Sequence, residues 1–219
     1  MSIRKFHFSN SEFYHVYNRG NSKQIIFLDD YDKIRFTQLL VVMNKEARQN
    51  LSDLSPDSVY IKNNDPLVAI GAYVIMDNHF HILLKQLKDG GVIKYIQKVS
   101  TAYVGYFNKK YKRTGALFEG KFKAKHANTD IYLNYLYAYI HFNPAKMVDK
   151  EWKRNIVSKK NKNAINFIKM YPFSSFHDYC GIQREESSVL SRSEFPLYFK
   201  SSKDFIESLI RWLPLEEKQ

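Results

Sequence analysis

The feature that most constrains the fold is residues 71–86, GAYVIMDNHFHILLKQ. Two apolar runs flank a polar Asp-Asn pair at 77–78, a pattern typical of a β-hairpin with a tight turn. Because side chains alternate between the faces of a strand, His79 and His81 project from one face and Phe80 from the other. Two neutral imidazoles side by side on a rigid strand can offer two nitrogens to one divalent metal ion. A surface or core role explains such a pair equally well, so the rest of the chain must decide between them.

Positive charge is concentrated close to these histidines. The 219-residue chain has 34 Lys and Arg against 22 Asp and Glu, for a formal net charge of +12. Between residues 85 and 126 there are 11 Lys and Arg but only two acids. This concentration favours a nucleic-acid partner over a merely solvated surface. The candidate contacts to phosphate groups are Arg19, Lys109, Lys110, Lys112, Arg113, Lys121, Lys123 and Lys125.

Composition limits the compartment and the kinds of site. Cys180 is the single cysteine of the chain, which excludes an internal disulfide and a multi-cysteine zinc site. No stretch approaches the ~20 apolar residues of a membrane-spanning helix, and the amino-terminal residues contain no apolar run. We therefore expect a cytoplasmic protein with no membrane partner.

The order of the expected elements indicates an α+β fold. Besides the hairpin, the patterns predict strands at 12–19 and 116–125, and helices at 30–47, 92–111, 131–143 and 203–214. We expect an antiparallel sheet of four or five strands, with two helices packed on one face and the metal site on the other. The 131–143 helix should lie near the histidine face. Residues 1–148 are assigned to this domain, and 149–219 to a C-terminal extension with a basic linker and a helical tail.

The 131–143 helix carries further candidate groups. Tyr132, Tyr135 and Tyr139 share one side of it, and Tyr139 and Asn143 are neighbours because they are four residues apart. The amide oxygen of Asn143 can complete the coordination of a metal ion, and the phenol of Tyr139 can act as a nucleophile. On spacing alone, each of these tyrosines is more typical of packing than of catalysis. In the first strand, His15 is likewise interpreted as a packed residue and not as a ligand.

Five segments together resemble the REP-associated tyrosine transposases, a branch of the HUH single-tyrosine transposase superfamily. They are YHVYNRGNSKQIIF at 14–27, AYVIMDNHFHILL at 72–84, YFNKKYKRTGALFEGKFK at 106–123, YLNYLYAYIHFNP at 132–144 and YPFSSFHDYCG at 171–181. The family's histidine–hydrophobic–histidine motif matches residues 79–81. Its catalytic tyrosine, followed four residues later by Asn or Gln, matches Tyr139 and Asn143. His141 departs from the family, where an acidic residue is frequent at this position.

The resemblance implies a function for these residues. It implies a ferredoxin-like or RNA-recognition-motif-like palm and a divalent ion, Mg²⁺ or Mn²⁺, held by His79, His81 and Asn143. Tyr139 would attack single-stranded or hairpin DNA, form a 5′-phosphotyrosine bond and later rejoin the strand, with His79 and His81 also catalytic. Family members pair as dimers, so a homodimer is expected.

Several alternatives remain open at the level of sequence. Tyr135 and Tyr137 flank Tyr139 and compete with it as the nucleophile. A catalytically inactive nucleic-acid-binding protein would keep the same fold and basic surface. A nucleotide hydrolase that uses histidines on a strand is the third alternative, but it usually needs a further histidine close by, and none lies between residues 82 and 125.

Overall fold

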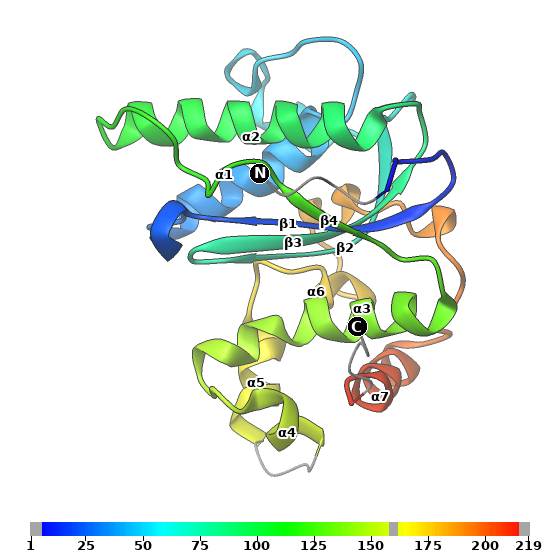
Figure 1. The fold of residues 1–219 in the computed structure, drawn as a ribbon. Coiled ribbons are helices and arrows are strands. Elements are labelled where there is room, and N and C mark those ends of the chain that lie inside the picture. Colours follow the sequence, from blue (N-terminus) through cyan, green and yellow to red (C-terminus); the bar gives the residue numbers. More distant parts are fainter. Residues whose placement is uncertain (1–5, 158–161, 215–219) are drawn as a thin grey trace.

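The computed structural model describes residues 6–157 and 162–214. Its centre is an antiparallel four-stranded sheet with the strand order β2-β3-β1-β4 (Figure 1). The strands are β1 (Phe13–Arg19), β2 (Val68–Met76), β3 (His79–Gln86) and β4 (Lys123–His126). This confirms the expected α+β fold with an antiparallel sheet of four strands.

The β2–β3 hairpin forms where the sequence predicts it. Met76 pairs with His79, so the chain reverses in the two residues between them. In this turn the carbonyl of Asp77 accepts hydrogen bonds from the amides of Ile26 and Phe27, at 2.9 and 3.0 Å. These bonds fix the turn to the segment that follows β1. Every residue of β2 is buried, which explains why its apolar run does not alternate with polar residues.

Two long helices cover the sheet face opposite the histidines. They are α1 (Asp30–Val42) and α2 (Gly91–Lys110), drawn above the sheet in Figure 1. The side chain of Asp29 caps α1 by accepting a hydrogen bond from the amide of Asp32 at 2.9 Å. Phe80 points into this layer, where its ring centre lies 4.8 Å from that of Phe36. The expected packing of two helices against one face is therefore confirmed.

The histidine face is covered by α3 (Asp130–Phe142) and by the C-terminal part of the chain (Figure 1). The hydroxyl of Thr129 caps α3 by accepting a hydrogen bond from the amide of Tyr132 at 3.2 Å. Among the described residues, four more α-helices follow: α4 (Trp152–Val157), α5 (Lys162–Met170), α6 (Phe176–Tyr179) and α7 (Ser202–Trp212). α7 packs against α3. The position of α3 confirms the prediction, but the sequence did not predict that the C-terminal helices complete this layer.

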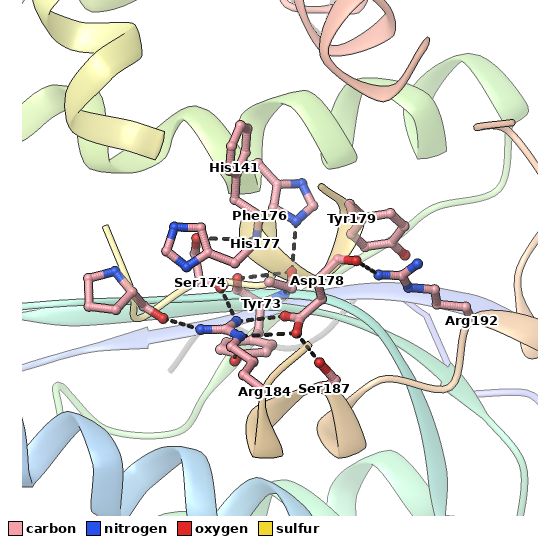
Figure 2. A network of polar contacts seen from close by, with 12 residues as sticks. Tyr73, His141, Ser174, Phe176, His177, Asp178, Tyr179, Arg184, Ser187 and Arg192 are labelled. Atoms are coloured by element: carbon pink, nitrogen blue, oxygen red, sulfur yellow. Dashed lines mark hydrogen bonds and ion pairs between the residues drawn. The ribbon is translucent and has the colours of Figure 1, made fainter. Parts of the chain in front are cut away.

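A buried polar network holds residues 171–195, called here the C-terminal segment, against the sheet (Figure 2). The guanidinium of Arg184 donates to the carboxylate of Asp178, over 3.0 Å from Nε and 2.6 Å from a terminal nitrogen. Asp178 is almost completely buried and also accepts a hydrogen bond from the Ser187 hydroxyl at 2.6 Å. Arg184 further donates to the phenol oxygen of Tyr73 in β2, over 3.2 Å. Because the pair is buried, losing either partner would leave an uncompensated charge.

The outer edge of β2 is covered by the same segment. The amide of Ile75 donates to the carbonyl of Phe173 at 2.9 Å, and the amide of Ser175 donates to the carbonyl of Tyr73 at 3.0 Å. The phenol of Tyr171 donates to the carbonyl of Ile75 at 2.6 Å. These bonds occupy backbone groups that an edge strand would otherwise expose.

The strand predicted at 116–125 is wrong in its first part. Regular pairing is confined to β4, and the chain before it makes only one isolated bridge, between Gly20 and Phe118. Gly120 has a φ of +90°, a conformation that turns the chain and interrupts the expected alternation. Leu117 and Phe118 are instead buried in the core beneath α2.

The connections contain short 3₁₀ helices. They are Asn21–Lys23, Leu51–Asp53, Pro56–Ser58, Asn143–Met147, Glu185–Val189 and Arg192–Glu194. The polar stretch at 48–66 is otherwise irregular, as its composition predicts.

Two glycine substitutions test how tightly the C-terminal segment is seated. A Cβ added at Gly71 in β2 would lie 2.6 Å from the buried ring of Phe195, whereas one at Gly105 in α2 would meet nothing within 4 Å. Gly71→Ala should therefore lower the free energy of unfolding by about 1–3 kcal/mol through overpacking. Gly105→Ala should raise it by up to about 1 kcal/mol, because alanine favours a helix. Urea unfolding measures both, and equal effects of the two changes would contradict this packing.

Candidate active site

The sheet register brings side chains from three strands to one face. Tyr17 pairs with His81 and Arg19 with His79 across β1 and β3. On the other side of β1, His15 pairs with Lys125 of β4. Since directly paired residues of an antiparallel sheet project from the same face, all of these side chains point toward α3.

Each histidine of the pair has one ring nitrogen held by the protein. Nδ1 of His79 lies 2.6 Å from the side-chain oxygen of Asn78, which is an acceptor, so Nδ1 carries the proton and Nε2 keeps its lone pair. Nδ1 of His81 lies 2.8 Å from Nε2 of His15. The His79 and His81 ring centres are 5.1 Å apart, with the ring planes almost perpendicular. This arrangement fixes both rings and leaves the lone pair of His79 Nε2 able to accept a hydrogen bond or to bind a cation.

All three imidazoles are neutral at neutral pH. Burial, followed by the charge of Lys125, lowers the pKa of His15 to about 3. Burial and then the charge of Lys146 lower the pKa of His79 to about 4. Burial also holds the pKa of His81 well below its usual value. Neutral imidazoles are the form that binds metal ions.

Asn143 reaches this pair from the end of α3. Its side chain is fully buried, and its Oδ1 lies 3.4 Å from Nε2 of His79. Its Nδ2 is buried without a hydrogen-bond partner among the described residues. Pro144 follows it and ends the α-helix, so the chain continues as the 3₁₀ helix Asn143–Met147. The amide is therefore placed by the helix end and directs its oxygen at His79.

Tyr139 lies one turn earlier on α3, beside His81 and His15. Its ring centre is 5.3 Å from that of His81 and 5.9 Å from that of His15, both in edge-to-face geometry. The side chain is partly exposed. The ammonium groups of Lys146 and Lys153 lie 5.3 and 5.4 Å from its ring centre. A phenol between two cations and beside neutral imidazoles can bear developing negative charge.

The structure separates the competing tyrosines. Tyr137 is 1% exposed and faces away from the histidines, with its ring centre 5.2 Å from that of Phe199. Burial holds the pKa of Tyr137 well above its usual value. Tyr135 is nearly buried, and its hydroxyl accepts a hydrogen bond from Lys153 at 3.0 Å. Tyr139 is thus the α3 tyrosine whose ring contacts His81 and His15.

His141, which departs from the family pattern, lies in the core behind α3. It is fully buried, and its Nε2 lies 2.7 Å from the hydroxyl of Ser175, which connects α3 to the segment along β2 (Figure 2). Its position is structural and does not reach the histidine pair.

Sequence reasoning missed three residues of the site. His15 is a packed residue, as predicted, but it packs against His81 and holds its ring nitrogen. It is also the nearby histidine that the hydrolase alternative lacked, although its Nε2 is occupied by His81. Lys146 and Lys153 belong to segments with no local signal of proximity to Tyr139. Only the β1–β3 register and the fold of the C-terminal part place these residues at the candidate active site.

The predicted phosphate contacts do not lie on one surface. Arg19 and Lys125 lie on the histidine face, with Lys123 on the same face of β4, but Arg19 is engaged with Glu119 through two hydrogen bonds. Lys109, Lys112 and Arg113 lie at the end of α2, on the far side of the sheet, and Lys121 is exposed just before β4. Lys110 contacts the carboxylates of Asp29 and Asp32, at 2.7 and 2.8 Å.

Within the described residues, no group of three or more His, Cys, Asp or Glu side chains has the geometry of a metal site. None of the described helices combines the length and the apolar character that crossing a membrane requires.

Neither a protein-family model nor a curated protein matches the sequence. Among solved structures, the fold is similar to that of a REP-associated tyrosine transposase bound to a REP hairpin. The similarity has a TM-score of 0.52 at 15% sequence identity and covers 85% of this chain and 90% of that one. At this identity the likeness establishes a related fold.

Among the basic residues predicted to contact phosphate, Lys110 has a structural role through its ion pairs with Asp29 and Asp32. Its partner Asp32 is fully buried and also accepts hydrogen bonds from the hydroxyls of Tyr106 and Tyr111. Lys110→Met should lower the free energy of unfolding by about 1–3 kcal/mol, because it leaves a buried carboxylate short of its cation. Lys109→Met, at an exposed neighbour, should change it by less than about 0.5 kcal/mol. Chemical denaturation of both variants checks this, and equal stabilities would contradict a structural role for Lys110.

Proposed function

We propose that this protein is a metal-dependent transposase that cleaves and rejoins single-stranded DNA through a 5′-phosphotyrosine intermediate at Tyr139. The observation that carries the proposal is the position of the Tyr139 ring, edge-on to His81 and one helical turn from Asn143, whose oxygen faces His79. A nucleophile and three candidate metal ligands thus meet in one place. The fold shared with a hairpin-bound transposase supports hairpin DNA as the substrate.

The donor atoms fit a divalent ion. Nε2 of His79 and Oδ1 of Asn143 both present lone pairs, and they face each other at 3.4 Å. Two acceptors in this arrangement are satisfied by a shared cation and not by each other. The Asn78 and His15 contacts at the Nδ1 atoms are the outer hydrogen bonds that orient metal-binding histidines. Two imidazoles favour Mn²⁺, although Mg²⁺ is also accepted by sites with oxygen ligands.

The bound ion would supply Lewis-acid polarisation of a non-bridging phosphate oxygen and would orient the phosphate. The protein's own side chains supply the nucleophile and the remaining charge stabilisation. The phenol oxygen of Tyr139 attacks phosphorus in line with the leaving 3′ oxygen, so one P–O bond forms as another breaks. The phenol proton leaves to solvent, and the departing 3′ oxygen takes a proton from solvent and is released as a 3′-hydroxyl. Lys146 and Lys153 stabilise the negative charge on the tyrosine oxygen and the phosphate.

Rejoining is the reverse step, in which a 3′-hydroxyl attacks the phosphotyrosine and Tyr139 leaves. One phosphate ester replaces another at each step, so no external energy source is required. In the proposed site, Tyr139 and His81 come from one chain. A dimer remains a separate prediction.

A covalent-adduct assay tests the nucleophile. The protein is mixed with end-labelled single-stranded hairpin DNAs from its genomic flanks and Mn²⁺, and a denaturing gel is run. We expect a metal-dependent shifted band that is lost in Tyr139→Phe, because phenylalanine keeps the packing but removes the attacking oxygen. Tyr137→Phe is the matched control and should keep the band. A band that survives Tyr139→Phe would contradict this assignment, and tight binding without any band would favour the non-catalytic alternative.

Metal binding is tested without reference to activity. Calorimetric titration with Mn²⁺ should show one site that His79→Ala, His81→Ala or Asn143→Ala abolishes. His15→Ala should weaken it about 10- to 100-fold, because His15 orients His81 without being a ligand. His7→Ala, at an exposed histidine near the amino terminus, serves as the control. Unchanged Mn²⁺ affinity in the Asn143 variant would exclude the proposed ligand set.

A further inference from the structure

We propose that the cavity beside Tyr139 is a binding site for one unpaired nucleotide of the DNA strand, whose base stacks on Tyr132 and whose phosphates contact Lys125 and Lys153. This site deepens the proposed function and rests on it, since it names how the single strand is held next to the nucleophile. The argument uses the shape of the cavity, its aromatic walls and its charge.

The cavity lies between the sheet and α3. Its volume is about 350 Å³, within the range of about 300–1,000 Å³ typical of small-ligand sites. His15 and His81 lie at its base and Tyr139 borders it, so an occupant touches the candidate active site directly. Tyr17 lines it from β1, while Tyr132 and Tyr135 line it from α3.

The α3 wall is a ladder of stacked rings that ends at the nucleophile. The ring centres of Tyr132 and Tyr135 are 6.1 Å apart with 18° between their planes, and those of Tyr135 and Tyr139 are 5.8 Å apart with 27°. Tyr135 is nearly buried within the ladder, but Tyr132 and Tyr17 are partly exposed. Every nucleobase has a flat π face, so such rings bind bases with little regard to sequence.

The two lysines lie on different walls of the same cavity. Lys125 comes from β4 and Lys153 from α4 in the C-terminal part of the chain. The ammonium of Lys153 is 5.6 Å from the ring centre of Tyr135 and 5.4 Å from that of Tyr139. Cations beside aromatic faces are the combination found in sites for single-stranded nucleic acid. A purely structural tyrosine ladder explains Tyr135, but it does not explain the opening between Tyr132, Tyr17 and the two lysines.

Stacking and phosphate contact can be separated with two probes. One is a fluorescent oligothymidylate, and the other is a strand of equal length in which every nucleotide is abasic. Binding is measured by fluorescence anisotropy in the Tyr139→Phe background without metal, so that no cleavage occurs. Tyr132→Ala should weaken oligothymidylate binding about fivefold to a hundredfold, the equivalent of losing one stacked base. The same change should leave the abasic strand unaffected.

Two further variants complete the test. Lys153→Gln should weaken both probes by the same factor and reduce the salt dependence of binding, because its contact is with phosphate. Tyr31→Ala removes a tyrosine that is 75% exposed on α1, on the opposite side of the sheet, and should change neither affinity. If Tyr132→Ala weakens both probes equally, or neither, the base-stacking site is overturned.

These outcomes are distinguishable from failure of the proposed function. If the covalent adduct forms but Tyr132→Ala has no base-dependent effect, the chain cleaves DNA without this nucleotide site. If the base-dependent effect is present but no DNA gives an adduct, the nucleotide site is correct and the catalytic proposal is wrong. Failure to bind either probe overturns the nucleotide site itself.

Discussion

The register in which β3 pairs with β1 and β2 is the constraint on which the site depends. A slip of one residue would turn every side chain of β3 to the other face, moving the histidines into the α1–α2 core and Phe80 toward α3. Both ends of the hairpin resist such a slip. The Asp77 carbonyl is bound by two amides at the turn, and at the other end the buried side chain of Gln86 accepts from the amide of Val92 at 3.2 Å.

The same pairing sets the electrostatics of the site. Because β1 lies between β3 and β4, His15 meets His81 on one side and Lys125 on the other. Burial under α3 then keeps the imidazoles neutral, so the positive charge on this face comes from lysines and not from histidines. The neutral nitrogens can bind a metal ion and the lysines can contact a phosphate, which is why one face can serve both proposals.

What could be predicted from the sequence was what local spacing determines. The hairpin, the helix predicted at 131–143 and the one-turn separation of Tyr139 from Asn143 follow from turn patterns and helix periodicity, and the structure has all three. His15 could not be placed, because its contact with His81 depends on which strands pair and in which register. Regular pairing begins only at β4 because of the positive φ of Gly120, which the apolar alternation around it conceals.

The C-terminal part of the chain contributes to the site in a way that no local pattern indicates. Trp152 and Lys153 of α4 lie against the Tyr139 ring, and Lys146 precedes them in the 3₁₀ helix after α3. Long-range packing of α4 and α7 decides these positions. The basic cluster at the end of α2, in contrast, is visible in the sequence but lies away from the histidine face, so proximity along the chain overstated its link to the site.

The measurement that tests the central claim most directly is mass-spectrometric mapping of the DNA-linked residue. The covalent complex is isolated, nuclease and protease are added, and fragmentation locates the nucleotide within the peptide that spans α3. The account predicts that the nucleotide is attached to Tyr139 and that Tyr132, Tyr135 and Tyr137 are unmodified. Attachment to any of these three tyrosines, or to a residue outside α3, would contradict it.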